Sequence, residues 1–457
     1  MGQGTGRISI SSGVARCLVL GAALALSLSS VGRTWGENGS APLKAPAPAL
    51  RVGTSGDYPP FSMRDANGSF TGFDIEVARA YAADRGLAVE FVLFRWPELQ
   101  SRLMAEVFDV AMSGITVRGD RLALAPMTAS VARTDAVLLT RTGTAGTTRD
   151  WSSLMVGVNR GGHLEQVARS KLPHARIVPV DDNLRLPSLL MLGEVDAIVT
   201  DTLEATPFQR PNEGGMAQAH FEVAQVLSHD RKAYWVTPKA TALAEDLNAW
   251  LAQREADGSL DRLRGRYFGE GPARRLDLAS ARVMDLIGRR LMLMPAVAWA
   301  KQASGRAIED SAREEVVEKS AAKAARDAHL DQSAYLKLVR AQFAAAKSVQ
   351  RAATSAASAH AGRSPDEGLR ELAQVLRPAI ERIDREILAQ LRDLAPVPAS
   401  SEDLVAALRV DAPVPGLDDE MLRSLTEAMM QIAATRRRSE PVHTPPHPSL
   451  SPSAGER

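Results

Sequence analysis

The sequence has little of several features that mark specialised classes of protein. Its only cysteine is Cys17, so a chain that has lost its N-terminal segment can form neither disulfides nor thiol-based sites. The formal net charge is +1, which excludes the strongly basic field of a nucleic-acid-binding protein. Aromatic residues make up only 5% of the chain, and no apolar run reaches the roughly 20 residues that span a bilayer.

Patterns that bind metals or phosphates are also missing. The eight histidines are scattered, and prolines interrupt the tail motif VHTPPH. No glycine-rich phosphate loop follows a predicted strand. We therefore expect no metal and no organic cofactor. The length of 457 residues favours two or three domains.

The N-terminal segment has the layout of an export signal. Arg7 and Arg16 precede the apolar run of residues 17–32, and small residues follow it. This layout predicts a signal peptide and processing region over residues 1–36, then a Pro/Ala linker over 37–49. An uncleaved membrane anchor is the alternative. With cleavage, we expect a periplasmic protein that has no membrane contact.

Residues 50–271 alternate between short apolar runs and amphipathic segments. Strands are expected at LRVGTS, VEFVLF and VFDVAMSGI, with helices between them, and the same alternation begins again at SLMVGVN. Such alternation predicts parallel sheets covered by helices. We expect two α/β lobes, the second inserted into the first, with the chain crossing between them near Leu139 and His229.

Residues 276–436 show no strand pattern and are rich in alanine. We expect an all-α domain in which a weaker helix occupies residues 402–436 and stronger helices occupy 277–304, 311–328, 332–359 and 366–394. Residues 437–457 are rich in proline and serine, which predicts a disordered tail.

The first expected helix places cations among apolar residues. Arg290 and Lys301 are 11 residues apart, so on a continuous helix they lie on the same side. A buried cation is costly unless an anion meets it, which favours an anionic ligand. Pro295 should kink this helix or reset its start. Ser311, three residues before a glutamate, has the pattern of a capping box for the next helix.

The sequence over 50–271 resembles the type II periplasmic binding proteins, a family of bilobed amino-acid receptors. The resemblance lies in the opening GDYPPFSMRDANGSFTGFDIEVARAYA and in FDVAMSGITVRGDR and GEVDAIVTD. It implies that Arg121 grips a ligand carboxylate, for which a forked guanidinium is suited. It also implies that Asp201 faces the ligand's amino group. An exposed helical arginine is the alternative for Arg121.

Within that family, the chain is similar to the cyclohexadienyl dehydratases. The similarity rests on WPEL (96–99), MSGIT (112–116), NRGG (159–162) and TDTLEA (200–205). It implies that Glu204 is the catalytic acid, where the alternative is a surface carboxylate. It further implies substrate contacts from Trp96, Ser113, Thr116 and Asn159, whose following glycines begin a helix that favours an anion.

Two positions depart from the dehydratase pattern. Thr134 stands where that family has a lysine, and Arg133 beside it is the candidate to supply the positive charge. His163 stands where the family has a threonine after the glycines. Both departures concern the grip on the substrate and neither involves Glu204.

The helical domain resembles the secreted branch of the all-helical chorismate mutases. The resemblance lies in RRL, AVAWAK and IEDSAR, and further on in RAQFAAAKSVQ and AIERIDREIL. It implies that Lys301 and Gln350 are catalytic and that the substrate is bound by Arg290, Asp310, Arg313 and Arg385. Ala346 stands where that branch often has a serine or threonine. A helical hairpin with solvated cations is the alternative.

Together these features predict an α/β bilobed domain like the periplasmic binding proteins, followed by an all-α chorismate-mutase-like domain. The expected function is to rearrange chorismate to prephenate and then to dehydrate prephenate or arogenate, with these small molecules as the partners. Two alternatives stay open: an amino-acid receptor fused to a mutase, and a pair of domains of which only one is active.

Overall fold

The computed structural model of the chain shows strands and helices up to Phe268 and helices from Leu278 onward. The expected signal region, all but the end of the linker, and the tail lie outside the described residues. Within the described part of the chain, every helix is too short or too polar to cross a bilayer. The described residues are 48–144, 153–209, 221–269, 276–355, 364–392, 394 and 400–436.

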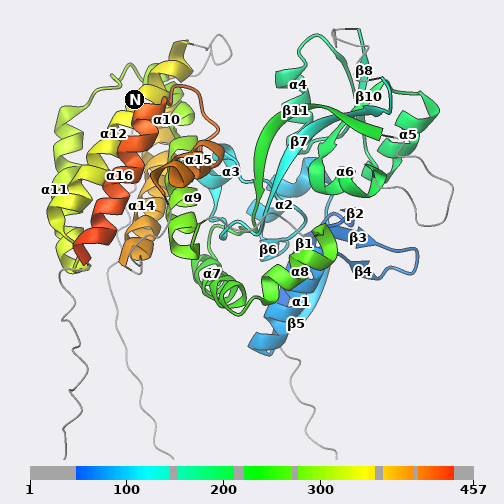
Figure 1. The fold of residues 1–457 in the computed structure, drawn as a ribbon, viewed down its shortest axis with the longest axis horizontal. Helices are drawn as coiled ribbons and strands as arrows, with labels where there is room; N and C mark the ends of the chain where they lie inside the picture. The colour runs from blue at the N-terminus through cyan, green and yellow to red at the C-terminus, as the bar shows by residue number, and fades with distance from the viewer. Residues whose placement is uncertain are drawn as a thin grey trace, which may run out of the picture. The chain divides into compact units, whose positions relative to one another are not determined.

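The first lobe is built on a four-stranded sheet in the order β12-β6-β1-β5 (Figure 1). Strands β1, β5 and β6 are parallel, and β12 runs antiparallel to β6. A small antiparallel sheet, β2-β3-β4, adjoins it in sequence. The elements are β1 (Ala49–Thr54), β2 (Asp57–Tyr58), β3 (Ser62–Arg64), β4 (Phe70–Thr71), α1 (Phe73–Arg85), β5 (Ala88–Leu93), η1 (Trp96–Glu98), α2 (Leu99–Met104), β6 (Val110–Ala111), α3 (Gly119–Leu124), β12 (Trp235–Val236), α7 (Thr241–Ala256) and α8 (Ser259–Phe268).

The second lobe contains a five-stranded sheet in the order β11-β7-β10-β8-β9. Strands β8, β9 and β10 are parallel, as the strand–helix alternation predicts, and β7 and β11 are antiparallel partners at one edge. The elements are β7 (Ala132–Arg141), β8 (Met155–Asn159), α4 (His163–Lys171), β9 (Arg176–Val180), η2 (Asn183–Arg185), α5 (Leu186–Leu192), β10 (Ala197–Asp201), α6 (Thr202–Gln209) and β11 (Phe221–Lys232).

Strands β7 and β11 carry the chain into and out of the second lobe. They already pair at Ala132 and Lys232, and the bridge Met127–Trp235 lies on the first-lobe side. The crossing expected near Leu139 is therefore wrong by several residues, because Leu139 is fully buried inside the second sheet. The strand β7 begins at the hinge with the polar residues Arg133, Thr134 and Asp135, and its apolar run follows inside the second lobe.

The described residues of the C-terminal region form helices joined by short loops and contain no strand. Pro295 lies in the first turn of α10, and the helix expected over 277–304 is divided at Leu293. The next helix is capped by Asp310, one residue before the expected Ser311. The elements are α9 (Leu278–Met292), α10 (Met294–Ala303), α11 (Ser311–Asp327), α12 (Gln332–Ser355), α13 (Pro365–Glu371), the π-helical turn η3 (Leu372–Leu376), α14 (Arg377–Arg392), α15 (Ser401–Asp411) and α16 (Asp419–Arg436).

One apolar core joins the first lobe to these helices. Leu122 of α3 and Met127 belong to the same buried cluster as Ile287 and Leu291 of α9. Gly119 makes the approach possible, because a Cβ atom there would lie 2.3 Å from the Met292 carbonyl oxygen. The first lobe and the helical region thus share buried apolar surface, which is the main stabilising term of a fold.

Candidate functional site

A cavity lies where the segments after β6, β8 and β9 meet Lys232 of the hinge strand β11. About 330 Å³ of space there is not filled by protein atoms, and this volume includes space open to solvent. In an open α/β sheet, the carboxyl ends of the strands are the usual place for a ligand. The residues that line it are Tyr58, Trp96, Gly114, Thr116, Arg121, Asn159, Gly162, His163, Leu164, Asn183 and Lys232.

Four of the predicted site residues line this cavity, namely Trp96, Thr116, Arg121 and Asn159. Arg121 is buried, donates from Nη1 to the Thr116 carbonyl oxygen at 2.8 Å, and lies over the Trp235 ring. Burial lowers the pKa of Arg121 to about 9, so it remains a cation at neutral pH. The buried Asn159 Nδ2 has no hydrogen-bond partner, so it is available to a ligand.

Glu204 lies directly behind the cavity wall. Its carboxyl accepts hydrogen bonds from Asn183 Nδ2 and Thr200 Oγ1, and Asn183 separates it from the cavity. Burial raises the pKa of Glu204 to about 8, and the neighbouring Asp201 charge acts in the same direction. The carboxyl is therefore mostly protonated at pH 7, as a proton donor must be.

Asp201 is fully buried at the end of β10. Its Oδ1 accepts the backbone N–H groups of Leu203 and Glu204, both at 3.0 Å. Its Oδ2 accepts the Tyr58 hydroxyl and lies 3.3 Å from Lys232 Nζ. Sequence reasoning predicted Asp201 but missed its two partners from the opposite lobe and the hinge.

The remaining dehydratase candidates lie away from the cavity. The Ser113 hydroxyl is buried against Ser55. Arg133 forms an ion pair with Asp411 of α15 at 2.8 Å, and Thr134 bonds to the hydroxyl of Thr202. Arg133 therefore directs its charge toward the helical region and does not replace the missing lysine at the cavity.

His163, which stands where the dehydratase family has a threonine, contacts the hinge strand. It lines the cavity and its Nε2 lies 2.9 Å from the Asp230 carboxylate on β11. Burial lowers the pKa of His163, so the ring is neutral at pH 7 and bonds an anion with its N–H. The histidine thus ties α4 to the hinge strand.

The helical region holds a second group of candidates. Arg290 is buried and donates from Nε to Asp384 of α14 at 2.7 Å, whereas its buried Nη1 has no partner. Gln350 of α12 is also buried. Its Nε2 lies 3.6 Å from the Met294 sulfur, and its Oε1 has no partner. Unpaired buried polar atoms are costly. Arg290 Nη1 is a donor available to a ligand, whereas Gln350 Oε1 can only accept.

Lys301 lies on α10 with its Nζ 2.7 Å from the Ile308 carbonyl oxygen. Burial lowers the pKa of Lys301, while Asp310 and then Glu314 act in the opposite direction. Asp310 caps α11 by accepting the N–H of Arg313 at 3.0 Å. These contacts gather the predicted residues of α10 and α11 around the loop between the two helices.

Arg313 forms an ion pair with α14, whereas Arg385 is exposed. Arg313 reaches Glu381 of α14 at 3.6 Å, one helical turn from Asp384, the partner of Arg290. Arg385 is exposed, and Asp384 before it makes the contact with α9. Sequence reasoning missed Asp384 and Glu381, although their three-residue spacing on one face of a helix was a usable signal.

Metal ions need a group of ligand side chains to hold them. Within the ranges that the structure describes, no group of three or more His, Cys, Asp or Glu residues is arranged to hold an ion.

Two known families match different parts of the chain. Residues 50–270 match the bacterial extracellular solute-binding proteins, family 3. Residues 274–351 match chorismate mutase type II. The two matches correspond to the bilobed region and to the first helices of the C-terminal region, as the sequence motifs predict.

Similar proteins include an enzyme and a binding protein. The chain is 32% identical over 219 residues to a cyclohexadienyl dehydratase of Pseudomonas aeruginosa, covering 46% of this chain and 79% of the relative. It is 25% identical over 223 residues to the L-cystine-binding protein TcyJ of Escherichia coli K12, covering 48% and 82%.

Among solved structures, an ancestral amino acid-binding protein described as a precursor of cyclohexadienyl dehydratase aligns with a TM-score of 0.44 and 30% identity. That alignment covers 48% of this chain and 95% of the other. The identity and coverage of the Pseudomonas relative decide the assignment. The chain belongs to the family 3 bacterial extracellular solute-binding proteins, and in it the binding-protein fold is followed by a helical region that matches chorismate mutase type II.

Proposed function

We propose that the chain is an exported bifunctional enzyme that rearranges chorismate to prephenate in its helical region and dehydrates prephenate or arogenate in its bilobed region. The observation that carries the second activity is Glu204, a buried carboxyl held protonated near pH 7 behind a cation-lined cavity. A receptor that only binds has no use for such an acid. The similarity to a cyclohexadienyl dehydratase supports the same reading.

The proposed dehydration needs one proton donor and anchors for carboxylates. Prephenate loses its ring carboxylate as CO2, the electron pair moves into the ring, and hydroxide leaves as water once Glu204 protonates it. Arg121 and Asn159 would anchor carboxylates beside Trp96 and Thr116. Because Asn183 stands between Glu204 and the cavity, substrate must displace its side chain to meet the acid.

The proposed mutase reaction needs no proton transfer. The substrate dianion has to be held in a folded conformer, which is the role we assign to Arg290, Arg313 and Arg385. Lys301 and Gln350 would donate to the ether oxygen as negative charge develops there. In the structure Asp384 bonds Arg290, so a substrate carboxylate must share or replace that contact.

The first experiment gives chorismate to the purified protein and follows chorismate, prephenate and phenylpyruvate over time. Formation of phenylpyruvate supports both activities. Accumulated prephenate contradicts the dehydratase, and unchanged chorismate contradicts the mutase. Purified prephenate, supplied separately, tests the bilobed region when the mutase is inactive.

Two substitutions assign the residues. Glu204→Gln should abolish dehydration but keep substrate binding, because the amide preserves shape and removes the transferable proton. Glu245→Gln, at an exposed position on α7, is the matched control and should behave like the wild type. Dehydration by E204Q at more than a few per cent of the wild-type rate contradicts the assignment of the acid.

A second candidate function is an amino-acid receptor fused to a mutase. It is favoured by the similarity to the L-cystine-binding protein, and it requires a ligand ammonium group to displace Lys232 from Asp201. Tight binding of an amino acid together with no turnover of prephenate or arogenate would support it over the dehydratase.

Export to the periplasm is part of the proposal. It is supported by the arginine-flanked apolar run at the N-terminus and by a family described as extracellular. Fractionation of cells that produce the full chain, with the mature N-terminus sequenced, tests it. Recovery of an uncut chain in the cytoplasm contradicts it.

A further inference from the structure

Lys232 presents a buried ammonium group to the cavity. It is the last residue of β11, its side chain is almost fully buried, and it belongs to the cavity lining. Its Nζ lies 3.0 Å from Thr116 Oγ1, 3.2 Å from the Tyr58 hydroxyl oxygen and 3.3 Å from Asp201 Oδ2. The hinge strand thereby places a fixed cation between the two lobes.

Lys232 and its neighbours engage both carboxylate oxygens of Asp201. Two backbone N–H groups occupy Oδ1, while the Tyr58 hydroxyl and Lys232 occupy Oδ2. Asp201 does not line the cavity; Tyr58 and Lys232 do. A ligand in the cavity therefore meets the lysine ammonium and not the aspartate, and the place of a ligand ammonium on this carboxylate is already taken.

The charged side chains that line the cavity are positive. Among the described residues that line it, Arg121 and Lys232 are cations and none is an aspartate or glutamate. Asp230 is engaged by the ring of His163 and by the Ser228 hydroxyl. An additional ammonium group on a ligand would face two cations at low dielectric, where repulsion is strong.

The lysine at the cavity comes from the hinge strand β11, whereas the sequence pointed to Arg133 on β7. Lys232 pairs with Ala132 in the β11–β7 register, two residues from Thr134, whose hydroxyl is bonded to Thr202. Arg133 is committed to Asp411. The positive charge expected from Arg133 is thus supplied by Lys232.

We infer that Lys232 determines specificity: by occupying Asp201 with the protein's own ammonium group, it selects a substrate bearing carboxylates and a keto group over the equivalent α-amino acid. Resting on the proposed function, this means that prephenate is used in preference to arogenate. It also means that free amino acids bind poorly. The three N–H groups of the lysine face Thr116, Tyr58 and Asp201, so a substrate carboxylate or keto oxygen that accepts from it replaces the contact with Thr116 or Tyr58.

The test compares ligands that differ only in the amino or keto group. The first measurement is kcat/KM for prephenate and for arogenate. The second is calorimetric binding of phenylpyruvate and of L-phenylalanine, which requires no turnover. The wild type should favour the keto member of each pair by at least about tenfold, the value of one charged hydrogen bond.

Lys232→Met keeps the length of the side chain and removes its charge. It should lower the keto-over-amino ratio by about 10- to 100-fold, because Asp201 becomes free to accept a ligand ammonium. Lys239→Met, at an exposed lysine seven residues on, is the matched control and should leave the ratio unchanged. Thermal unfolding and mutase activity check that the K232M protein is folded, and Lys232→Gln serves as a second variant.

The outcomes separate this inference from the proposed function. A wild type that favours arogenate or L-phenylalanine overturns the inference, with no variant needed. A folded K232M or K232Q protein with an unchanged ratio also overturns it. If neither prephenate nor arogenate is converted but phenylpyruvate still binds better than L-phenylalanine, the dehydratase proposal fails and the specificity of the cavity stands.

Discussion

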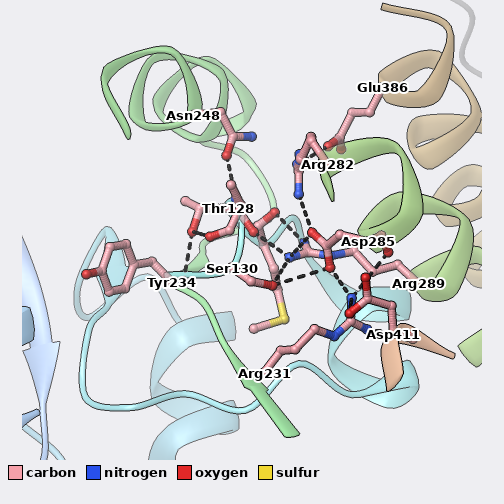
Figure 2. A network of polar contacts seen from close by, with 12 residues as sticks. Thr128, Ser130, Arg231, Tyr234, Asn248, Arg282, Asp285, Arg289, Glu386 and Asp411 are labelled. Carbon is pink, nitrogen blue, oxygen red and sulfur yellow. Dashed lines mark hydrogen bonds and ion pairs between the residues drawn. The ribbon is translucent and has the colours of Figure 1, made fainter. Parts of the chain in front are cut away.

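Asp285 of α9 is the acceptor at the centre of a buried cluster of arginines (Figure 2). It accepts hydrogen bonds from Arg282 Nη1 at 2.6 Å and Arg289 Nε at 3.0 Å, and it bonds Arg231 of the hinge strand β11. Burial alone would raise the pKa of Asp285, but the charges of Arg289, Arg231 and Arg282 outweigh burial and hold it well below its usual range. The carboxylate is therefore charged at every pH at which the protein would be studied.

Asp285→Asn removes this charge and changes the volume of the side chain very little. Three buried guanidinium groups then lose their shared anion, and breaking a buried ion pair from one side costs about 3–5 kcal/mol of folding free energy. At a urea m-value of about 3 kcal/mol/M, the unfolding midpoint should fall by about 1 to 1.7 M. A folded pKa below the unfolded one stabilises above the unfolded value of about 3.9, so the deficit should be equal at pH 6 and pH 8.

The assay is urea unfolding of the wild type, D285N and the control Asp327→Asn, followed by circular dichroism. Asp327 pairs with Lys323 on the exposed surface of α11, where an ion pair contributes at most about 1 kcal/mol. Loss of less than about 1 kcal/mol in D285N would refute the argument that this carboxylate compensates three buried cations. A deficit that vanished at pH 6 would refute the sign of its pKa shift.

Three other measurements test separate features. Dehydration should decline as the pH rises through about 8, because ionisation removes the Glu204 proton; a rate that is flat to pH 10 contradicts this. Lys301→Ala should lower mutase kcat/KM by at least about a thousandfold, the scale of one electrostatic catalytic contact, with exposed Lys323→Ala as the control. Gly119→Val should unfold at a temperature several degrees lower, because its side chain would collide with the Met292 carbonyl oxygen; an unchanged midpoint contradicts the close packing of α3 on α9.

The order of strands and helices in the bilobed region follows from local sequence. The runs at 50–55, 89–94 and 197–201 are apolar and bounded by turns, and they form β1, β5 and β10. Periodicity is a local property, so it identifies an element without fixing where that element pairs. The hinge position was missed for this reason: β7 begins at the boundary with the polar residues Arg133 to Asp135, and its apolar run lies inside the second lobe.

Individual side-chain partners required the tertiary structure. The sequence predicted that Pro295 would kink the helix of Arg290 and Lys301 or reset its start, and the structure divides it at Leu293. Their partners, Asp384 and the Ile308 carbonyl oxygen, come from other segments. The sequence named the residues of the candidate mutase site, while the anions that meet the arginines were not predicted.

The hinge strand β11 connects the cavity to the helical region through two consecutive residues. Successive side chains on a strand point to opposite faces, and here Arg231 bonds Asp285 while Lys232 bonds Tyr58 and Thr116. Arg133, the register partner of Arg231 on β7, bonds Asp411 of α15. Both hinge strands are thus held by carboxylates of the helical region at the same level. The fused helices therefore do more than supply a second site, because their carboxylates fix the strand that carries the cavity's lysine.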